Sequence, residues 1–214
     1  MHKEIYRDEI YQFRSDKNRP FIIDCGANCG VSVAWFKQAY PDSRIVAVEA
    51  DPKIYAMLQR NIERRGHDNV TRLQRAVANA SGTLAFQCIG ADSGRLQVEG
   101  ATGTKADSAV VHVETIRLDD LIANEHVDFL KIDIERSETD VICSSRKLDQ
   151  VSQIFVEYHS FIAAPQRLSL LLSTLEKAGF RYYINRIYAP SNPYLEITDN
   201  QSMDLQLSIF ATRA

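Results

Sequence analysis

The stretch that sets the fold is residues 20–40, PFIIDCGANCGVSVAWFKQAY. It opens with a short apolar run that ends in Asp24, which predicts a buried strand. A loop containing Gly26 and Gly30 follows and leads straight into a helical stretch over residues 32–40. We therefore expect a strand, a loop and a helix, which is the beginning of an alternating α/β fold.

The same unit recurs further along the chain. Residues 44–49 form a second apolar run, and Asp51 and Pro52 then open a helix that reaches about residue 65 and stops at Gly66. Strands that alternate with helices imply right-handed crossovers and a mostly parallel sheet. Further strands are predicted over residues 70–77, 83–89, 110–115, 127–134, 152–158, 180–187 and 205–212, further helices over 118–124, 138–145 and 167–177, and a flexible loop over 90–107.

Length and composition describe one ordinary globular domain. The 214 residues are enough for one well-buried core, whereas two domains of this total size would both be marginal. The net charge of -3 offers no general attraction for nucleic acid or an anionic membrane. Acidic residues stand where a signal peptide needs apolar ones, and no run is long enough to span a bilayer, so we expect a cytoplasmic protein. Residues 1–19 are predicted to be an N-terminal helical extension of a domain over residues 20–214.

The glycine loop does not fit a dinucleotide. A G-x-G-x-x-G fingerprint counted from Gly26 would need glycine where Asn28 and Val31 stand. Asp24 lies just before the loop, where it would repel a pyrophosphate but suits the ammonium group of a bound methionine moiety. Gly26 and Gly30 let the backbone approach a ligand, and the helix start can accept a carboxylate.

Glu49 ends the second predicted strand, roughly 20 residues beyond the loop, where an acid can accept hydrogen bonds from both hydroxyls of a ribose. The alternative is an acid at a strand end that only faces solvent. The loop and the acid together favour a nucleoside-like ligand.

Three segments give the chain a family resemblance. They are Ile23-Asp24-Cys25-Gly26-Ala27-Asn28-Cys29-Gly30, Val48-Glu49-Ala50-Asp51-Pro52, and Leu130-Lys131-Ile132-Asp133-Ile134-Glu135. In this combination the chain resembles the FkbM-type methyltransferases, which use S-adenosylmethionine. The resemblance implies a single Rossmann-like class I methyltransferase domain. It would have a mostly parallel seven-stranded sheet, helices on both faces and an antiparallel C-terminal strand.

The resemblance also implies roles for particular residues. Asp133 would face the methyl group that is transferred, and Glu49 would hold the ribose. One departure is Arg136, which stands where the family usually has glycine, so that a long cation could narrow the acceptor pocket or recognise an anionic acceptor. The residues implied to surround the cofactor are Asp24, Gly26, Ala27, Asn28, Gly30, Glu49, Ala50, Ala76 and Asp133.

Methyl transfer to an alcohol needs a group that removes the proton of the hydroxyl, because a neutral alcohol is a poor nucleophile. Asp133, Glu135, Glu157 and His159 all fall at or just beyond strand ends. His159 is attractive because the unperturbed pKa of histidine is about 6.5, although a histidine hydrogen-bonded to the backbone is the plainer alternative. We take Asp133, Glu135 and His159 as the catalytic candidates, and no His, Asp or Glu spacing demands a metal.

The acceptor is predicted to be a hydroxyl of a small molecule or of a sugar or glycan. Amino-group methyltransferases often carry Asn/Asp-Pro-Pro-Tyr after the fourth strand, and this chain has Asp133-Ile134-Glu135 there instead. A similar run, Ser191-Asn192-Pro193-Tyr194, is more simply a turn.

Two alternatives are a non-catalytic module that kept the nucleoside pocket and an RNA methyltransferase. The second rests only on an arginine cluster that more simply faces solvent, so a nucleic-acid partner is not expected. The cluster comprises Arg60, Arg64, Arg65, Arg72 and Arg75. The sequence leaves the oligomeric state open.

Overall fold

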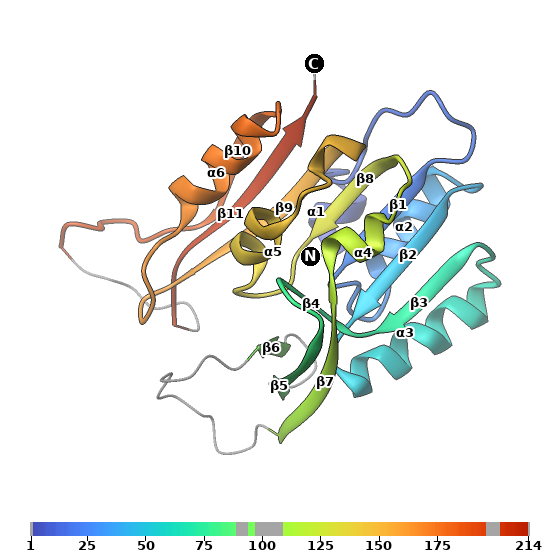
Figure 1. The fold of residues 1–214 in the computed structure, drawn as a ribbon, viewed down its shortest axis with the longest axis horizontal. Coiled ribbons are helices and arrows are strands. Elements are labelled where there is room, and N and C mark those ends of the chain that lie inside the picture. The colour runs from blue at the N-terminus through green and yellow to red at the C-terminus, as the bar shows by residue number, and fades with distance from the viewer. Residues whose placement is uncertain (1, 89–93, 97–108, 196–201, 214) are drawn as a thin grey trace.

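A seven-stranded sheet forms the centre of the molecule (Figure 1). The computed structural model describes residues 2–88, 94–96, 109–195 and 202–213. The strand order is β10-β11-β9-β8-β1-β2-β3. Strands β3, β2, β1, β8 and β9 run parallel, and β11 pairs antiparallel with both of its neighbours. The strands are β1 (Phe21–Cys25), β2 (Arg44–Glu49), β3 (Val70–Gln74), β8 (Val127–Ile132), β9 (Val151–Phe161), β10 (Arg181–Tyr188) and β11 (Met203–Thr212). The predicted fold class is confirmed.

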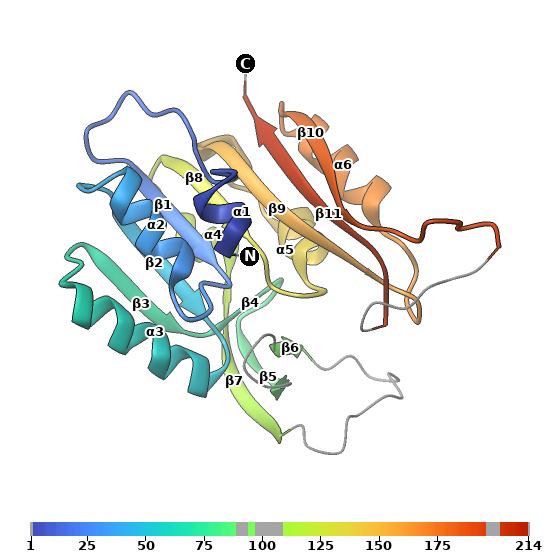
Figure 2. The same cartoon turned by 180° about the vertical axis from the view of Figure 1, so that it is seen from behind.

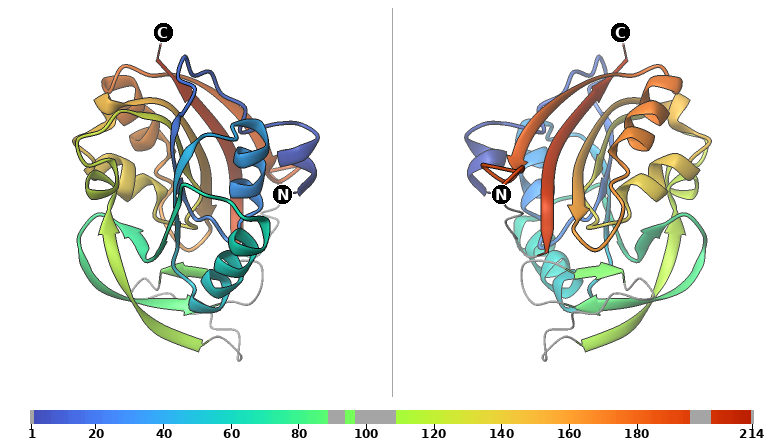
Figure 3. Two further views of the ribbon diagram at one scale, coloured as in Figure 1. Left: turned by 90° about the vertical axis from the view of Figure 1, so that its right-hand side faces the viewer. Right: turned by 90° about the vertical axis from the view of Figure 1, so that its left-hand side faces the viewer.

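Helices cover both faces of this sheet, as the edge-on views in Figure 3 show. The helices are α1 (His2–Tyr6), α2 (Val31–Ala39), α3 (Pro52–Arg65), α4 (Leu118–Ile122), α5 (Glu138–Ser144), α6 (Leu168–Lys177) and the 3-10 turn η1 (Leu148–Gln150). Successive residues of β1 serve opposite faces: Ile22 joins the apolar cluster with α2 and α3, and Ile23 joins the cluster with α4, α5 and α6. A central strand buried on both faces explains why its sequence is continuously apolar.

A second sheet lies beyond the carboxyl ends of the parallel strands (Figure 1). Its order is β4-β7-β5-β6, from β4 (Ala76–Ala78), β5 (Gly82–Cys88), β6 (Gly94–Leu96) and β7 (Ala109–Arg117). The single strand predicted over residues 70–77 is therefore wrong. The chain leaves β2 after Gln74, and Ala76 pairs instead with Thr115 of β7. The second sheet covers the carboxyl ends of the parallel strands, which is where ligands of open parallel α/β sheets bind.

The N-terminal segment packs across the face that α2 and α3 cover (Figure 2). It is helical only over α1, and the chain then continues in turns, with Glu9 in a left-handed conformation with φ of 48°. The short amphipathic helix predicted within residues 1–19 is therefore α1, and residues 7–19 are not helical. Its apolar residues Ile5, Tyr11 and Phe13 are nevertheless buried in the core.

Two predicted irregular segments fall partly outside the described residues. The loop expected over 90–107 lies outside them except for Gly94–Leu96, which is strand β6. Ser191-Asn192-Pro193-Tyr194 forms the predicted turn, with Leu195 N donating to Asn192 O at 3.0 Å and Tyr194 fully exposed. Within the described ranges, no helix has the length and apolar character needed to cross a membrane.

Candidate functional site

A pocket opens where β1, β2 and β8 end, and residues Ala76, Val77 and Phe86 of the second sheet also line it. Its empty space is about 820 Å³, part of which is open to solvent. Its walls include most of the residues predicted for the ligand, namely Gly26, Ala27, Asn28, Glu49, Ala50, Ala76, Asp133 and Glu135. Asp24, Gly30 and His159 are not among the lining residues.

Gly26 is the point at which β1 comes closest to the segment after β8. Its φ is +81°, and a Cβ added there would sit 1.8 Å from the carbonyl oxygen of Asp133. Only glycine accommodates both this backbone conformation and this approach. Gly26 therefore lets two strand ends meet at the floor of the pocket, which is a different reason for glycine from the predicted approach to a ligand.

Glu49 is a buried carboxylate that organises the loop. Its Oε2 accepts a hydrogen bond from Asn28 N at 2.9 Å, and its Oε1 accepts one from Asp51 N at 2.8 Å. Burial raises the pKa of Glu49, although both backbone hydrogen bonds work in the opposite direction. Each carboxylate oxygen can accept more than one hydrogen bond, so both retain capacity toward the pocket.

Asp24 lies behind the pocket wall and is completely buried. Ser32 Oγ donates to its Oδ2 at 2.5 Å, and the ammonium of Lys131 lies 3.2 Å from its Oδ1. The same Lys131 ammonium lies 3.3 Å from Asp133 Oδ2 and donates to Gly26 O at 2.9 Å. The chain thus supplies its own ammonium at the place where Asp24 was expected to receive that of a ligand.

Gly30 also has a structural function. It begins α2 in the left-handed region, with φ of +90°, and a Cβ there would lie 2.8 Å from a methyl group of Leu58 in α3. It therefore permits close packing of α2 against α3 rather than direct contact with the pocket.

The carboxyl groups of Asp133 and Glu135 share the pocket wall at the end of β8. Burial raises the pKa of Asp133 to about 6 and that of Glu135 to about 7. The cation of Lys131 opposes the rise at Asp133. A carboxyl group whose pKa lies near neutrality is well placed to exchange a proton with a bound hydroxyl.

His159 is buried between carboxylates instead of facing the pocket. Its Nδ1 lies 2.9 Å from Glu138 Oε1, and its Nε2 lies 3.3 Å from Glu157 Oε1. Burial lowers the pKa of His159, but the carboxylates of Glu138, Glu157 and Asp133 outweigh that effect and raise it well above the ordinary value. Both ring nitrogens face carboxylates and neither faces the pocket, so this arrangement favours Asp133 and Glu135 over His159 as proton acceptors.

The sequence reasoning gave no role to several pocket residues. Ile5 and Tyr11 reach the pocket from the N-terminal segment, Phe86 from the second sheet, and Lys131 from β8. The helical spacing of Ile5 and Tyr11 predicts an apolar segment that packs on the domain or over its site, but it does not assign either residue to the pocket, and nothing local marks Phe86. Lys131 had a signal, because a lysine inside an otherwise apolar central strand needs a buried partner, and Asp133 two residues later points to the same face.

Arg136 also adopts the left-handed conformation, with φ of 87°. Its guanidinium lies over the ring of Phe161, 4.1 Å from the centroid. The backbone conformation explains why glycine suits this position. Arg136 is not among the residues that line the pocket.

Known proteins that resemble this chain include methyltransferases. A family model described as the methyltransferase FkbM domain matches residues 24–182. Methyltransferase sdnD from Sordaria araneosa is 27% identical over 172 residues, 66% of this chain and 66% of that protein. The 2-O-methyltransferase NoeI from Sinorhizobium fredii is 24% identical over 159 residues, 67% of this chain and 65% of that protein. The chain therefore spans just under two thirds of the length of both relatives.

Among solved structures, the methyltransferase FkbM from Methylobacillus flagellatus superimposes with a TM-score of 0.58 at 17% sequence identity. The match covers 97% of this chain and 47% of that one. A likeness at this identity speaks for the shared fold.

Proposed function

The chain belongs to the FkbM methyltransferase family, and from this premise we propose that it is an S-adenosylmethionine-dependent O-methyltransferase. Its acceptor would be a hydroxyl group of a small molecule or of a sugar. The observation that carries the proposal is the pocket itself, in which Glu49 of β2 and the carboxyl groups of Asp133 and Glu135 after β8 line one cavity. The groups that we propose for nucleoside recognition and for proton removal therefore line one cavity.

The residues present fit S-adenosylmethionine. Glu49 would hold the ribose hydroxyls with its remaining lone pairs, and the loop of Gly26, Ala27 and Asn28 would border the methionine portion. Ala50 and Ala76 have small side chains, which leave room for a flat base between the walls. When bound, this group supplies a methyl group carried on a positively charged sulfur.

The chain's own residues would orient the acceptor and take its proton. The carboxylate of Asp133 or Glu135 would take the proton of the acceptor hydroxyl, which leaves its oxygen free to receive the methyl group. Lys131 holds Asp133 in place through their ion pair. Orientation and exclusion of water account for most of what such a site must provide.

Two observations support oxygen as the accepting atom. The segment after β8 presents carboxyl groups rather than the amide and aromatic residues of an amino-group site. The relative NoeI is named a 2-O-methyltransferase. The structure does not favour an RNA acceptor, because Arg72 pairs with Glu63 and Arg75 pairs with Glu114, which leaves less of the arginine cluster available for phosphates.

The test is transfer of radiolabelled methyl from S-adenosylmethionine to a panel of sugars, polyols and phenols. Asp133→Asn and Glu135→Gln remove the two proposed proton acceptors, and Glu63→Gln on the surface is the matched control. General bases contribute about 100-fold or more, so at least one pocket variant should lose that much activity while the control retains it. Wild-type protein that binds S-adenosylmethionine but labels no hydroxyl would refute O-methyl transfer and support the non-catalytic alternative. Binding of NAD instead would refute the cofactor.

A further inference from the structure

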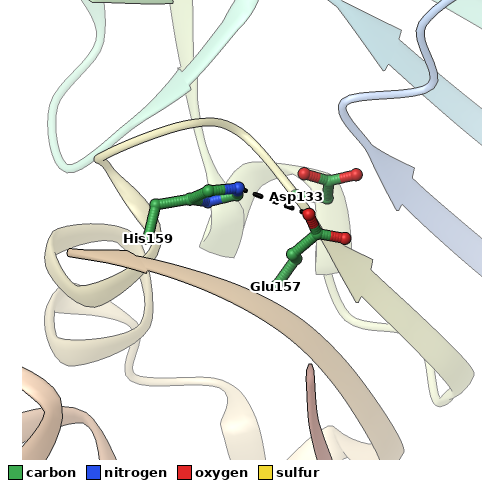
Figure 4. A group of neighbouring side chains, drawn as sticks. All are labelled: Asp133, Glu157 and His159. Carbon is green, nitrogen blue, oxygen red and sulfur yellow. Dashed lines mark ion pairs between the residues drawn. The ribbon is translucent and has the colours of Figure 1, made fainter. Parts of the chain in front are cut away.

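Three side chains next to the pocket form a compact set of metal-binding donor atoms (Figure 4). Asp133 follows β8, while Glu157 and His159 lie on β9. One donor atom from each lies within 4.8 Å of the other two. Ile132 pairs with Val156, so the next residues, Asp133 and Glu157, come side by side. His159 is two residues further along β9 and shares the face of Glu157.

The orientation of His159 is the one that metal-binding histidines adopt. Its Nδ1 is engaged by Glu138 at 2.9 Å, and its Nε2 points to Glu157 at 3.3 Å. Histidine ligands almost always donate their second ring nitrogen to a carboxylate or a similar acceptor, which fixes the ring for the metal. Glu138 supplies that acceptor from the start of α5.

The set is sheltered and yet borders the pocket. The side chains of His159 and Glu138 are 2% and 1% exposed, whereas those of Asp133 and Glu157 are 15% and 20% exposed. Asp133 lines the pocket, so an ion bound here would face the space proposed for the acceptor. Gln206, whose Nε2 donates to Glu157 Oε1 at 2.5 Å, would need to turn its amide oxygen toward the ion.

We propose that Asp133, Glu157 and His159 bind one divalent cation. An imidazole nitrogen and two carboxylate oxygens are a mixed set suited to a first-row ion such as Mn²⁺ or Zn²⁺. Three protein ligands leave coordination positions for water or for an acceptor oxygen. The ion would take the place of a proton on His159 Nε2 and would balance the carboxylates around the ring. This site does not depend on the proposed O-methyl transfer, because it is defined by the protein's own ligands.

The experiment measures Mn²⁺ binding to metal-free protein by electron paramagnetic resonance. Wild type should bind one ion per chain, and His159→Ala and Glu157→Gln should each weaken binding at least tenfold. Two matched controls should bind as wild type does. They are His126→Ala, which removes a histidine that is hydrogen-bonded to Ser152 at the start of β9, and Glu63→Gln on the surface.

Two further measurements distinguish loss of a metal ligand from misfolding of a variant. Thermal melts and S-adenosylmethionine titration show whether each variant is folded. In the wild-type protein, nitrogen hyperfine coupling to the bound Mn²⁺ reports an imidazole ligand without any mutation. Absence of binding by the wild type, or equal binding by folded His159→Ala, would overturn the proposal. Mn²⁺ binding by a chain that transfers no methyl group would leave the metal site standing and refute the proposed function alone.

Discussion

Substituting Gly26 by alanine tests the closest approach in the site. The added Cβ would lie 1.8 Å from the carbonyl oxygen of Asp133. Carbon and oxygen atoms in contact are normally at least about 3.3 Å apart, so β1 and the end of β8 would have to separate by about 1.5 Å. The left-handed backbone should lower the free energy of unfolding by about 1–2 kcal/mol for a residue other than glycine. Overpacking should lower it by about another 1–3 kcal/mol.

Gly66→Ala is the matched control. Gly66 is also left-handed, with φ of +60°, but a Cβ there would meet nothing within 4 Å. Gly66→Ala should lower the free energy of unfolding only by the cost of the left-handed backbone, about 1–2 kcal/mol. In a domain of this size 1 kcal/mol corresponds to about 2–4 °C in melting temperature, so Gly66→Ala should melt about 2–8 °C lower and Gly26→Ala about 4–20 °C lower.

The assay is thermal unfolding of the wild type and both variants, followed by methyl-transfer rates at a temperature at which all are folded. A displacement of about 1 Å at a reacting group can cost about 100-fold in rate, so Gly26→Ala should lose activity while Gly66→Ala keeps it. Equal melting temperatures and equal rates for the two variants would refute the argument that the Gly26 contact with Asp133 shapes the site.

Three further variants test charges around the pocket. Glu49→Gln should weaken S-adenosylmethionine binding about 10- to 100-fold, since a charge-assisted hydrogen bond contributes about 1.5–3 kcal/mol; an affinity within twofold of wild type by calorimetry would contradict a ribose role. Lys131→Met leaves the carboxylates of Asp24 and Asp133 without their shared cation and should lower the free energy of unfolding by about 3–5 kcal/mol. Denaturant unfolding measures this change, and a loss below about 1 kcal/mol would argue against the ion pairs. Arg136→Gly relieves a left-handed conformation that costs about 1–2 kcal/mol and loses a cation–π contact worth about 0.5–1 kcal/mol, so the free energy of unfolding should rise by about 0–1.5 kcal/mol. A gain of activity over an inactive wild type would support the non-catalytic alternative.

The main sheet could be predicted because its signals are local. An apolar run, a glycine loop and a helix follow each other within 20 residues at β1 and α2, and a capping Asp51 marks the next helix, where it accepts hydrogen bonds from Lys53 N and Ile54 N. The strands predicted over residues 83–89 and 110–115 correspond to β5 and β7, but no local signal assigns them to a separate sheet. Residues 70–77 read as one strand, and the exchange of partner at Arg75 depends on where β2 ends, which the segment itself does not encode.

The residues of the site were likewise predictable only where their signals are local in the sequence. Gly26 and Glu49 could be predicted as pocket residues because both lie at strand ends of one strand–helix–strand unit, at a recognisable spacing. The contact between Glu138 and His159 depends on how α5 packs against β9, 21 residues away in sequence, so His159 could be found but not its environment. That environment decides the chemistry, because carboxylates lie at both ring nitrogens of the candidate base and raise its pKa.

Lys131 shows how an internal charge changes the interpretation of Asp24. An acid before a glycine loop can receive a ligand's ammonium only if it is free to do so. Here the Lys131 ammonium contacts Asp24, Asp133 and the carbonyl of Gly26 at once, which ties the ends of β1 and β8 together. Removing the charge of Asp24 should therefore act through Asp133 and the pocket floor. Asp24→Asn is expected to lower stability and methyl transfer together, whereas a residue that only binds a ligand would lower affinity and leave unfolding unchanged.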